Sequence, residues 1–329
     1  MKNVAKLAGV SVSTVSRYLN DHPYIAEGKR ESIKKAMKEL DYVPSSVATQ
    51  LRSKKGTMIG VLVSRITNPF FSYLIDTIEK QARLNGYSVL IIQTYDDREA
   101  EIKILEMLKQ KVISGLIMCS VENTADVIDP YQKYGPIVLC NERLEGSKLP
   151  KILTDQEKAT YEAIHYLIEK GNQRIAYCTG GSFLDTGHGS SRNRGFKAAM
   201  EANNLLIKDN LIFRDMHTID DGRKVAAHLL QEDTTNFPEA VFAGSDEVAS
   251  GMVEVFLAKG KRVPEDVAVM GFDNQPFASM VSVPLTTVEQ PVHALGEEAT
   301  KLMLHLLNGQ AYEINHEQLN LTIVKRESA

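Results

Sequence analysis

Residues 2–20 read KNVAKLAGVSVSTVSRYLN and decide the fold of the N-terminal part of this 329-residue chain. One face of a first short helix is marked by Val4, Leu7 and Ala8. Gly9 ends that helix, and a second helix begins at Ser11 or Ser13. The buried face of the second helix consists of Val15, Tyr18 and Leu19. Two short helices joined by a turn that contains glycine predict a helix-turn-helix, whose second helix can enter the DNA major groove.

The outward face of the second helix carries small or hydroxylic side chains and one arginine: Val12, Ser13, Ser16 and Arg17. Such side chains can reach base edges and phosphates. An ordinary surface hairpin of two helices is the alternative, and the charge pattern argues against it. Residues 1–55 hold eleven of the 38 Lys and Arg but only five of the 42 Asp and Glu, a net charge of about +6 against about −10 for the remainder. A basic head on an acidic body is typical of a nucleic-acid-binding module attached to a larger domain.

A third helix over residues 27–40 closes the predicted three-helix head. Its apolar residues recur at helical spacing: Ile33, Ala36, Met37 and Leu40. Pro44 blocks its continuation, and Ser45 or Ser46 can cap a short helix that follows. So short a helix is not stable alone, so we expect it to fold when paired with its twin in a dimer and with DNA. Leu51 is then the expected wedge in a minor-groove base step, and a flexible linker with one incidental leucine is the alternative.

From residue 57 onward the sequence changes to buried apolar runs, each followed by a polar loop and an amphipathic helix. These runs are 58–64, 88–94, 115–120, 136–142, 174–181, 240–246, 267–273 and, more weakly, 210–213. Strands that alternate with helices predict parallel sheets covered by helices on both faces. Since about 270 residues exceed what one such sheet usually needs, we expect two similar lobes.

The ligand site of open parallel sheets lies beyond the carboxyl ends of the strands. The polar side chains expected there are Asn68, Thr94, Asn141, Ser245, Asp246 and Asp273. The aromatic side chains beside them are Phe70, Phe71 and Phe272. This set suits a polyol or another polar small molecule, with the aromatic rings stacked on a sugar face. Each polar residue could instead cap the helix that follows its strand, so both roles stay open.

Cysteine, histidine and the N-terminal sequence exclude several classes of protein. Three cysteines lie in or at the end of apolar runs without a C-x-x-C motif, which indicates buried thiols in a reducing compartment: Cys119, Cys140 and Cys178. The eight histidines show no H-E-x-x-H motif, so the sequence predicts no metal site and no cofactor. Lys2 and Lys6 are not followed by a long apolar run, which predicts a cytoplasmic protein without a membrane span.

These motifs together resemble the lac repressor/gal repressor (LacI/GalR) family of bacterial regulators over essentially the whole chain. The matching stretches include VAKLAGVSVSTVSRYLN, YVPSSVATQL, IGVLVSRITNPFF, SSRNRGF, VFAGSDEVASG, VPEDVAVMGFDN and PLTTVEQP. The resemblance implies a DNA-binding head, a hinge helix and a two-lobed core similar to periplasmic sugar-binding proteins, with the effector in the cleft between the lobes. It also implies a homodimer that binds a near-palindromic DNA operator.

The resemblance also implies roles for single residues. Base reading falls on Val12, Ser13 and Arg17, and the hinge wedge falls on Leu51. Effector binding falls on Phe70, Phe71, Arg192, Asp273 and Gln290. The chain departs from the family at two effector positions: Asn141-Glu142 stands where many members have Asp-Arg, and Ser245 stands where many have Asn. Both departures leave the identity of the effector open. The start at Met1-Lys2-Asn3 also lacks the usual hydroxyl cap of the first helix.

The predicted fold class is an N-terminal all-α helix-turn-helix head plus an α/β core of two doubly wound parallel-sheet lobes. The predicted domains are a head over 1–44, a hinge helix and linker over 45–56, and an effector-binding and dimerisation core over 57–329. Within the core, the N-lobe comprises about 57–155 and 286–317, and the C-lobe about 156–285 and 318–329.

The predicted function is ligand-responsive repression of carbohydrate-metabolism genes, with a sugar or sugar phosphate as the effector. An enzyme acting on a sugar or sugar phosphate is one alternative, but it lacks a G-x-S-x-G elbow and a phosphate-binding loop, so we predict no enzyme. A regulator gated by a protein partner is the other alternative. Whether the effector induces or corepresses does not follow from the sequence.

Overall fold

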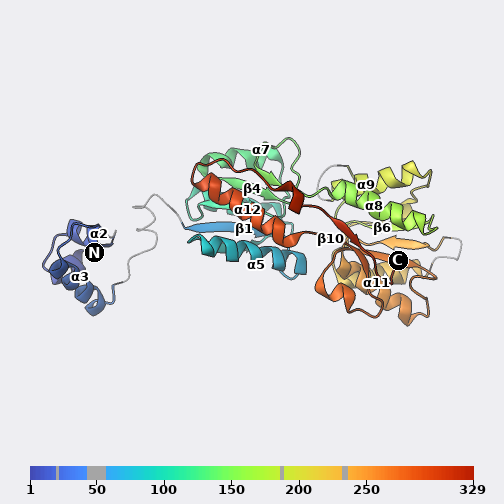
Figure 1. Ribbon diagram of the computed structural model, residues 1–329, viewed down its shortest axis with the longest axis horizontal. Coiled ribbons are helices and arrows are strands. Elements are labelled where there is room, and N and C mark those ends of the chain that lie inside the picture. The colour runs from blue at the N-terminus through green and yellow to red at the C-terminus, as the bar shows by residue number, and fades with distance from the viewer. Residues whose placement is uncertain (20–21, 43–56, 186–188, 232–235) are drawn as a thin grey trace. The chain divides into compact units, whose positions relative to one another are not determined.

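The computed structural model describes residues 1–329 except 20–21, 43–56, 186–188 and 232–235. The chain divides into two compact units, Met1–Thr57 and Met58–Ala329, and each is described by itself (Figure 1). The predicted hinge helix over 45–56, with Leu51, lies outside the described residues.

The first unit is the three-helix head, made of α1 (Lys2–Leu7), α2 (Val12–Leu19) and α3 (Glu27–Glu39). Its apolar core is a cluster of Val4, Ala5, Val15, Ile33 and Ala36, and Ile25 is also buried. The chain turns between α1 and α2 at Gly9, where φ is +63°. The Ser11 hydroxyl then accepts the N–H of Thr14 at 3.1 Å and caps α2, in agreement with the predicted start of this helix. The predicted burial of Leu7 is wrong: Leu7 is 46% exposed, because the buried face of α1 is formed by Val4 and Ala5.

The N-lobe contains a parallel sheet of order β2-β1-β3-β4-β5. Its strands are β1 (Met58–Val63), β2 (Ser88–Gln93), β3 (Gly115–Met118), β4 (Ile137–Cys140) and β5 (Lys151–Ile152). One face is covered by α5 (Pro69–Leu84) and α12 (Val292–Leu307). The other face is covered by α6 (Arg98–Lys109), α7 (Ala125–Ile128) and the 3-10 helix η1 (Asp129–Tyr134). The register runs from Met58 beside Ser88 to Val63 beside Gln93, so neighbouring strands end at one edge.

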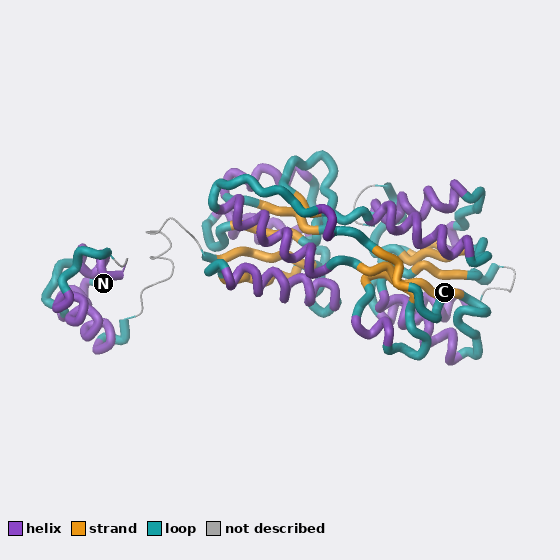
Figure 2. The backbone as a smooth tube through the Cα atoms, viewed as in Figure 1, coloured by secondary structure: helices purple, strands orange, loops and turns teal. Residues whose placement is uncertain are grey.

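The C-lobe contains a six-stranded sheet of order β11-β10-β9-β8-β6-β7. Figure 2 shows the strands of this lobe in orange between purple helices. Its strands are β6 (Ile175–Cys178), β7 (Ile212–Phe213), β8 (Ala240–Phe242), β9 (Ala268–Asp273), β10 (Thr286–Glu289) and β11 (Thr322–Val324). The covering helices are α8 (Gln156–Glu169), α9 (Ser190–Ala202), α10 (Ile219–Leu229) and α11 (Asp246–Ala258). Three 3-10 helices also occur in this part of the chain: η2 (Asp209–Leu211), η3 (Pro276–Ser279) and η4 (His316–Gln318). Pairing is parallel except at β11, which runs antiparallel to β10. The predicted fold class of a helix-turn-helix head and two doubly wound lobes is confirmed.

The predicted crossing between the lobes at residue 286 is wrong. Thr286–Glu289 form β10, which pairs with β9 inside the C-lobe sheet, and the chain crosses only afterwards. The sequence of this strand does not form an apolar run, because two of its buried residues are threonines. The hydroxyls of both threonines have hydrogen-bond partners inside the protein. Thr287 donates to Asp246 at 2.6 Å, and Thr286 donates to the carbonyl of Ala329 at 3.2 Å. The return crossing is also later than residue 318, because Leu319 packs in the N-lobe core.

Two further predictions concern the whole chain. Cys119, Cys140 and Cys178 are buried free thiols, as predicted. Within the described ranges, no helix is both long enough and apolar enough to span a membrane.

Candidate functional site

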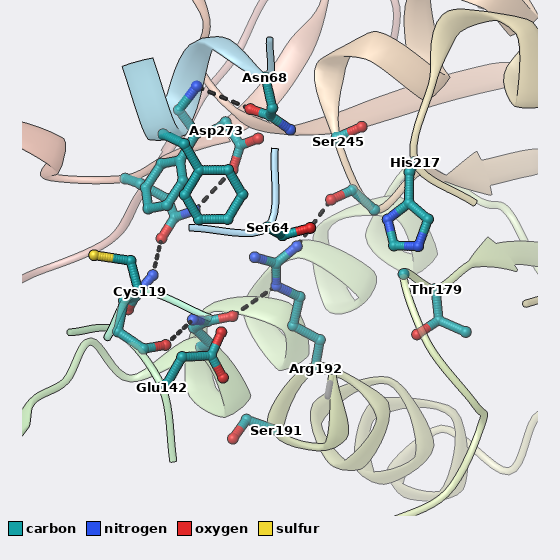
Figure 3. A pocket seen from close by; sticks show the side chains of 18 of the residues that line it. Ser64, Asn68, Cys119, Glu142, Thr179, Ser191, Arg192, His217, Ser245 and Asp273 are labelled. Atoms are coloured by element: carbon teal, nitrogen blue, oxygen red, sulfur yellow. Dashed lines mark hydrogen bonds between the residues drawn. The ribbon is translucent and has the colours of Figure 1, made fainter. Parts of the chain in front are cut away.

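A cavity of about 140 Å³ lies where the carboxyl ends of the strands of both lobes meet (Figure 3). It is lined by all eight residues predicted for the effector: Asn68, Phe70, Phe71, Asn141, Arg192, Ser245, Asp273 and Gln290. Three other candidates do not line it: Thr94, Asp246 and Phe272. The strand-end rule therefore found lining residues from Asn68 to Asp273, and the family resemblance supplied Arg192 and Gln290. The strand-end rule also gave three residues that do not line the cavity.

Arg192 comes from the first turn of α9 and is held by the C-lobe. Its Nε donates to Gln156 Oε1 at 2.7 Å, and its Nη1 donates to the Gly244 carbonyl at 2.8 Å. The guanidinium carbon lies 3.7 Å from the centre of the buried Phe272 ring, so this ring makes a cation–π contact with the arginine. Figure 3 shows the side chain extending from its helix toward the middle of the site. Two guanidinium nitrogens are thus engaged by protein groups, and among the residues that the structure describes Nη2 has no such hydrogen bond.

A relay of side-chain amides connects the two lobes at the cavity. Asn141 donates to Gln290 Oε1 at 2.8 Å, and Gln290 donates to Asp273 Oδ1 at 2.7 Å. Gln275 donates to Asp273 Oδ2 and to Asn68 Oδ1, each at 3.3 Å. Burial raises the pKa of Asp273 to about 6, while the Arg192 charge and these two amides oppose the rise. The relay orients the carboxylate of Asp273 at the junction of the lobes.

Several predicted site residues also have structural roles. For two of them this agrees with the alternative that polar residues at strand ends cap the following helices. Asn68 caps α5 by accepting the N–H of Phe70 at 2.9 Å, and Ser245 caps α11 by accepting the N–H of Val248 at 3.3 Å. Asp246 is fully buried and accepts the Thr287 hydroxyl and the N–H of Gln275, at 2.6 and 2.7 Å. Burial and the Asp273 charge raise the pKa of Asp246 to about 8.

The aromatic pair stands at the start of α5, immediately after Pro69. The rings of Phe70 and Phe71 meet edge to face, with 5.3 Å between their centres. Both line the cavity, and Phe70 and Phe71 also pack against the N-lobe core. They give the cavity an apolar part of its wall.

Sequence reasoning missed other lining residues, among them Arg65, Asp96, Gln156, Thr179 and His217. Glu142 was noted only as a departure from the family, but it lines the cavity. Burial, reinforced by the Glu122 charge, raises the pKa of Glu142 to about 8, and burial lowers the pKa of His217. Asp96 follows β2 at the same sheet edge as Glu142, so its position after a predicted strand was the available signal.

The head presents the predicted recognition face on α2. Val12, Ser13 and Arg17 are exposed, Ser16 is half-buried, and Val15 between them is fully buried. The face that packs in the head and the face that is open to a partner are therefore distinct.

Comparisons with known proteins cover both units of the chain. The profile of bacterial regulatory proteins of the lacI family matches residues 1–45, and that of a periplasmic binding protein-like domain matches residues 164–329. The NTD biosynthesis operon regulator NtdR of Bacillus subtilis (strain 168) is 37% identical over 325 residues, which are 98% of this chain and 95% of that protein.

Two solved structures are also similar. A LacI family transcriptional regulator from Lactobacillus casei with bound glucose is 40% identical, with a TM-score of 0.78 over 83% of this chain and 99% of that one. The lac repressor dimer bound to operator and the anti-inducer ONPF is 26% identical, with a TM-score of 0.79 over 99% of this chain and 97% of that one.

Proposed function

Since this chain belongs to the lacI family of bacterial regulatory proteins, we propose that it is a transcriptional repressor whose operator binding is controlled by a polyhydroxylated small molecule in the cavity. One observation carries the proposal: the chain combines a helix-turn-helix head with a cavity lined by all eight residues expected to contact an effector. The genes it controls are proposed to serve carbohydrate metabolism.

The head is proposed to bind operator DNA through α2. Val12 and Ser13 would contact base edges, Ser16 the groove wall or a phosphate, and Arg17 a guanine edge or adjoining phosphate. The related lac repressor was solved as a dimer on its operator, and we propose a homodimer on a near-palindromic operator here. The segment 45–56 is proposed to form the hinge helix, with Leu51 as the minor-groove wedge.

The core, residues 57–329, is proposed to bind the effector and to form the dimer. The related Lactobacillus casei regulator was solved with glucose, which supports a sugar or a sugar derivative as the class of effector. Arg192 Nη2 and the Asp273 carboxylate would bind neighbouring hydroxyls, with Asn141, Gln290, Asn68 and Ser245 completing the polar wall. Phe70 and Phe71 would stack on the apolar face of the ring.

The protein is proposed to be cytoplasmic, to need no cofactor and not to be an enzyme. Two contacts support the last point. The Ser245 hydroxyl caps α11, and both Asp273 oxygens accept side-chain amides, so neither is arranged as a nucleophile with its base.

The test is an operator-binding titration with and without a panel of sugars, sugar phosphates and sugar amines. At least one compound is expected to change the operator affinity of the wild type tenfold or more. Arg192→Ala should weaken this response more than tenfold, because it removes a charged hydrogen-bond donor from the cavity.

Arg194→Ala is the matched control. Arg194 lies two residues further along α9, pairs with Glu157 at 2.8 Å and does not line the cavity. This control should keep the wild-type response. A response that survives in Arg192→Ala would contradict the proposed site, and a chain that does not bind operator DNA at all would contradict the function.

A further inference from the structure

Two of the free thiols lie side by side at the carboxyl ends of neighbouring N-lobe strands. Cys119 follows β3 directly, and Cys140 is the last residue of β4. The register of these parallel strands ends with Met118 beside Leu139. The next residue of each strand is a cysteine, so the two cysteines face each other across the ladder. Both belong to the apolar cluster between the sheet and helices α5 and α12, so their side chains project from the same face of the sheet.

The spacing of the two strands suits a disulfide. Neighbouring strands lie about 4.8 Å apart, and a disulfide joins Cα atoms that are roughly 4.4–6.8 Å apart. The two thiols already interact, because a side-chain hydrogen bond with Cys140 is the largest cause that holds the pKa of Cys119 well above its ordinary value. Rotation of the two side chains is therefore enough to bring the sulfur atoms together, without a change in the register of the strands.

The cavity gives a small molecule access to one thiol of this pair. Cys119 lines the cavity, and Figure 3 shows its side chain among the lining residues. Cys140 does not line it, and its Sγ donates instead to the carbonyl oxygen of Leu295 at 4.0 Å. An oxidant in the cavity therefore meets Cys119 first, with Cys140 in place as the second thiol. Cys178 is equally buried but belongs to β6 of the other sheet, so the chain carries its own control thiol.

We propose that Cys119 and Cys140 form a reversible disulfide when a hydroperoxide such as hydrogen peroxide enters the cavity. The Cys119 sulfur attacks one peroxide oxygen and the O–O bond breaks, which gives a sulfenic acid and, with the thiol proton, one water. The Cys140 sulfur then attacks the Cys119 sulfur and the S–O bond breaks, which releases a second water with the Cys140 proton. The two thiols together lose two hydrogens and two electrons, and the peroxide is reduced to two waters.

The disulfide would form beside the amide relay that joins the lobes. Asn141 follows Cys140 directly, donates to Gln290 at 2.8 Å and accepts the Thr154 hydroxyl at 2.7 Å. Oxidation of the pair would therefore modify the wall of the cavity next to a group that orients Asp273. This inference goes beyond the proposed function, because the reaction needs neither an effector nor DNA.

The test is mass spectrometry of the folded, full-length protein after incubation with millimolar hydrogen peroxide. Since the Cys140 hydrogen bond and burial raise the pKa of Cys119, little thiolate is present, and the reaction is followed over hours. Trypsin cleaves after Lys133, between the two cysteines, so the disulfide would join two otherwise separate peptides. The wild type is expected to lose two hydrogens per chain, to yield this joined peptide with Cys178 still reduced, and to regain its starting mass with dithiothreitol.

Two serine variants sharpen the test. In Cys140→Ser the second thiol is missing, so Cys119 should gain oxygen as a sulfinic acid and no joined peptide should form. The matched control is Cys178→Ser, which should form the joined peptide at the wild-type rate. The wild-type measurement stands even if a variant does not fold. A wild type that keeps its starting mass, gains oxygen without losing hydrogens, or forms a disulfide with Cys178 or with a second chain would overturn the inference and leave the repressor function intact.

Discussion

The head and the core of this chain differ in how much apolar surface they bury and in the charge they carry. The described part of the head has one small apolar cluster, while each lobe of the core has apolar clusters on both faces of its sheet. Residues 1–55 carry about +6 and the remainder about −10. The difference indicates that the two units bind their ligands in different ways. The head is expected to bind DNA through its positive charge, and the core is expected to bind its ligand through a few oriented, buried side chains.

Removing the head should have the largest effect. A chain that begins at Met58 is expected to lose operator binding completely, because all candidate base-reading residues lie before it. Its ligand affinity should match that of the full-length protein, since the cavity is built from residues 64 to 290. Gel-shift and calorimetric titrations measure the two properties. Operator binding by the shortened chain would erase the distinction between the two units.

The second-largest effect is expected from salt, which should weaken DNA binding by the head much more than ligand binding by the core. Raising the salt from about 50 to 200 mM is expected to weaken operator binding about a thousandfold or more, because phosphate contacts by the basic head release counterions. Binding of a neutral sugar to the core should change far less. Fluorescence titrations over this range give both values. Equal salt dependence of DNA and sugar binding would show that the charge asymmetry has no functional meaning.

The success of sequence reasoning also differs between the two units. The head was predictable because its signals are local: an apolar period, Gly9 as a turn and Ser11 as a cap. Leu7 was misplaced, since a six-residue helix does not fix which side faces the core, and Leu40 is 42% exposed because α3 ends one residue before it. In the core, the long apolar runs predicted most strands. The strand Thr286–Glu289 was missed because its buried threonines have partners that only the folded chain supplies.

The candidate site shows the same limit. The strand-end rule located residues such as Asn141 and Asp273, because a parallel sheet places those ends at one edge. It could not find Gln156 or His217, which reach the cavity from a helix start and a loop of the C-lobe. It also could not tell that Asp246, one residue after Ser245, points into the protein and not into the cavity.

The pH dependence of the free energy of unfolding of the core should reveal the raised pKa of the buried Asp246 carboxyl group. Its pKa is about 8 in the folded protein, above the ordinary value near 3.8. The folded state therefore binds a proton that the unfolded state releases between these values. The free energy of unfolding should fall by on the order of a few kcal/mol as the pH rises from about 4 to 8, and level off above.

Asp246→Asn should make this slope shallower, although Asn satisfies only part of the original hydrogen bonding and lowers the overall stability. Urea unfolding at several pH values measures the slope. A slope as steep in Asp246→Asn as in the wild type would assign the effect to Glu142, Glu122 and Asp273, whose pKa values are also raised.

Two glycine substitutions should have opposite signs in the two units. In the core, α10 and α11 pack so closely that a Cβ at Gly251 would lie 2.0 Å from the carbonyl oxygen of Ile219. Gly251→Ala should therefore destabilise the core by roughly 3 kcal/mol. In the head, Gly28 lies in α3 with no atom within 4 Å of an added Cβ, so Gly28→Ala should stabilise the head by about 0.5–1 kcal/mol. Thermal unfolding of each variant tests both, and a stabilising Gly251→Ala would refute the described packing.

The central claim is that ligand in the cavity and operator on the head are energetically coupled. Coupling between two binding sites is reciprocal, so the factor by which ligand changes operator affinity must equal the factor by which operator changes ligand affinity. The direct measurement is a calorimetric titration of ligand into the full-length protein with and without a saturating operator duplex. We predict that the ligand affinities with and without DNA differ by the factor of ten or more that we expect in the operator titrations. Identical ligand affinities with and without DNA would contradict the account.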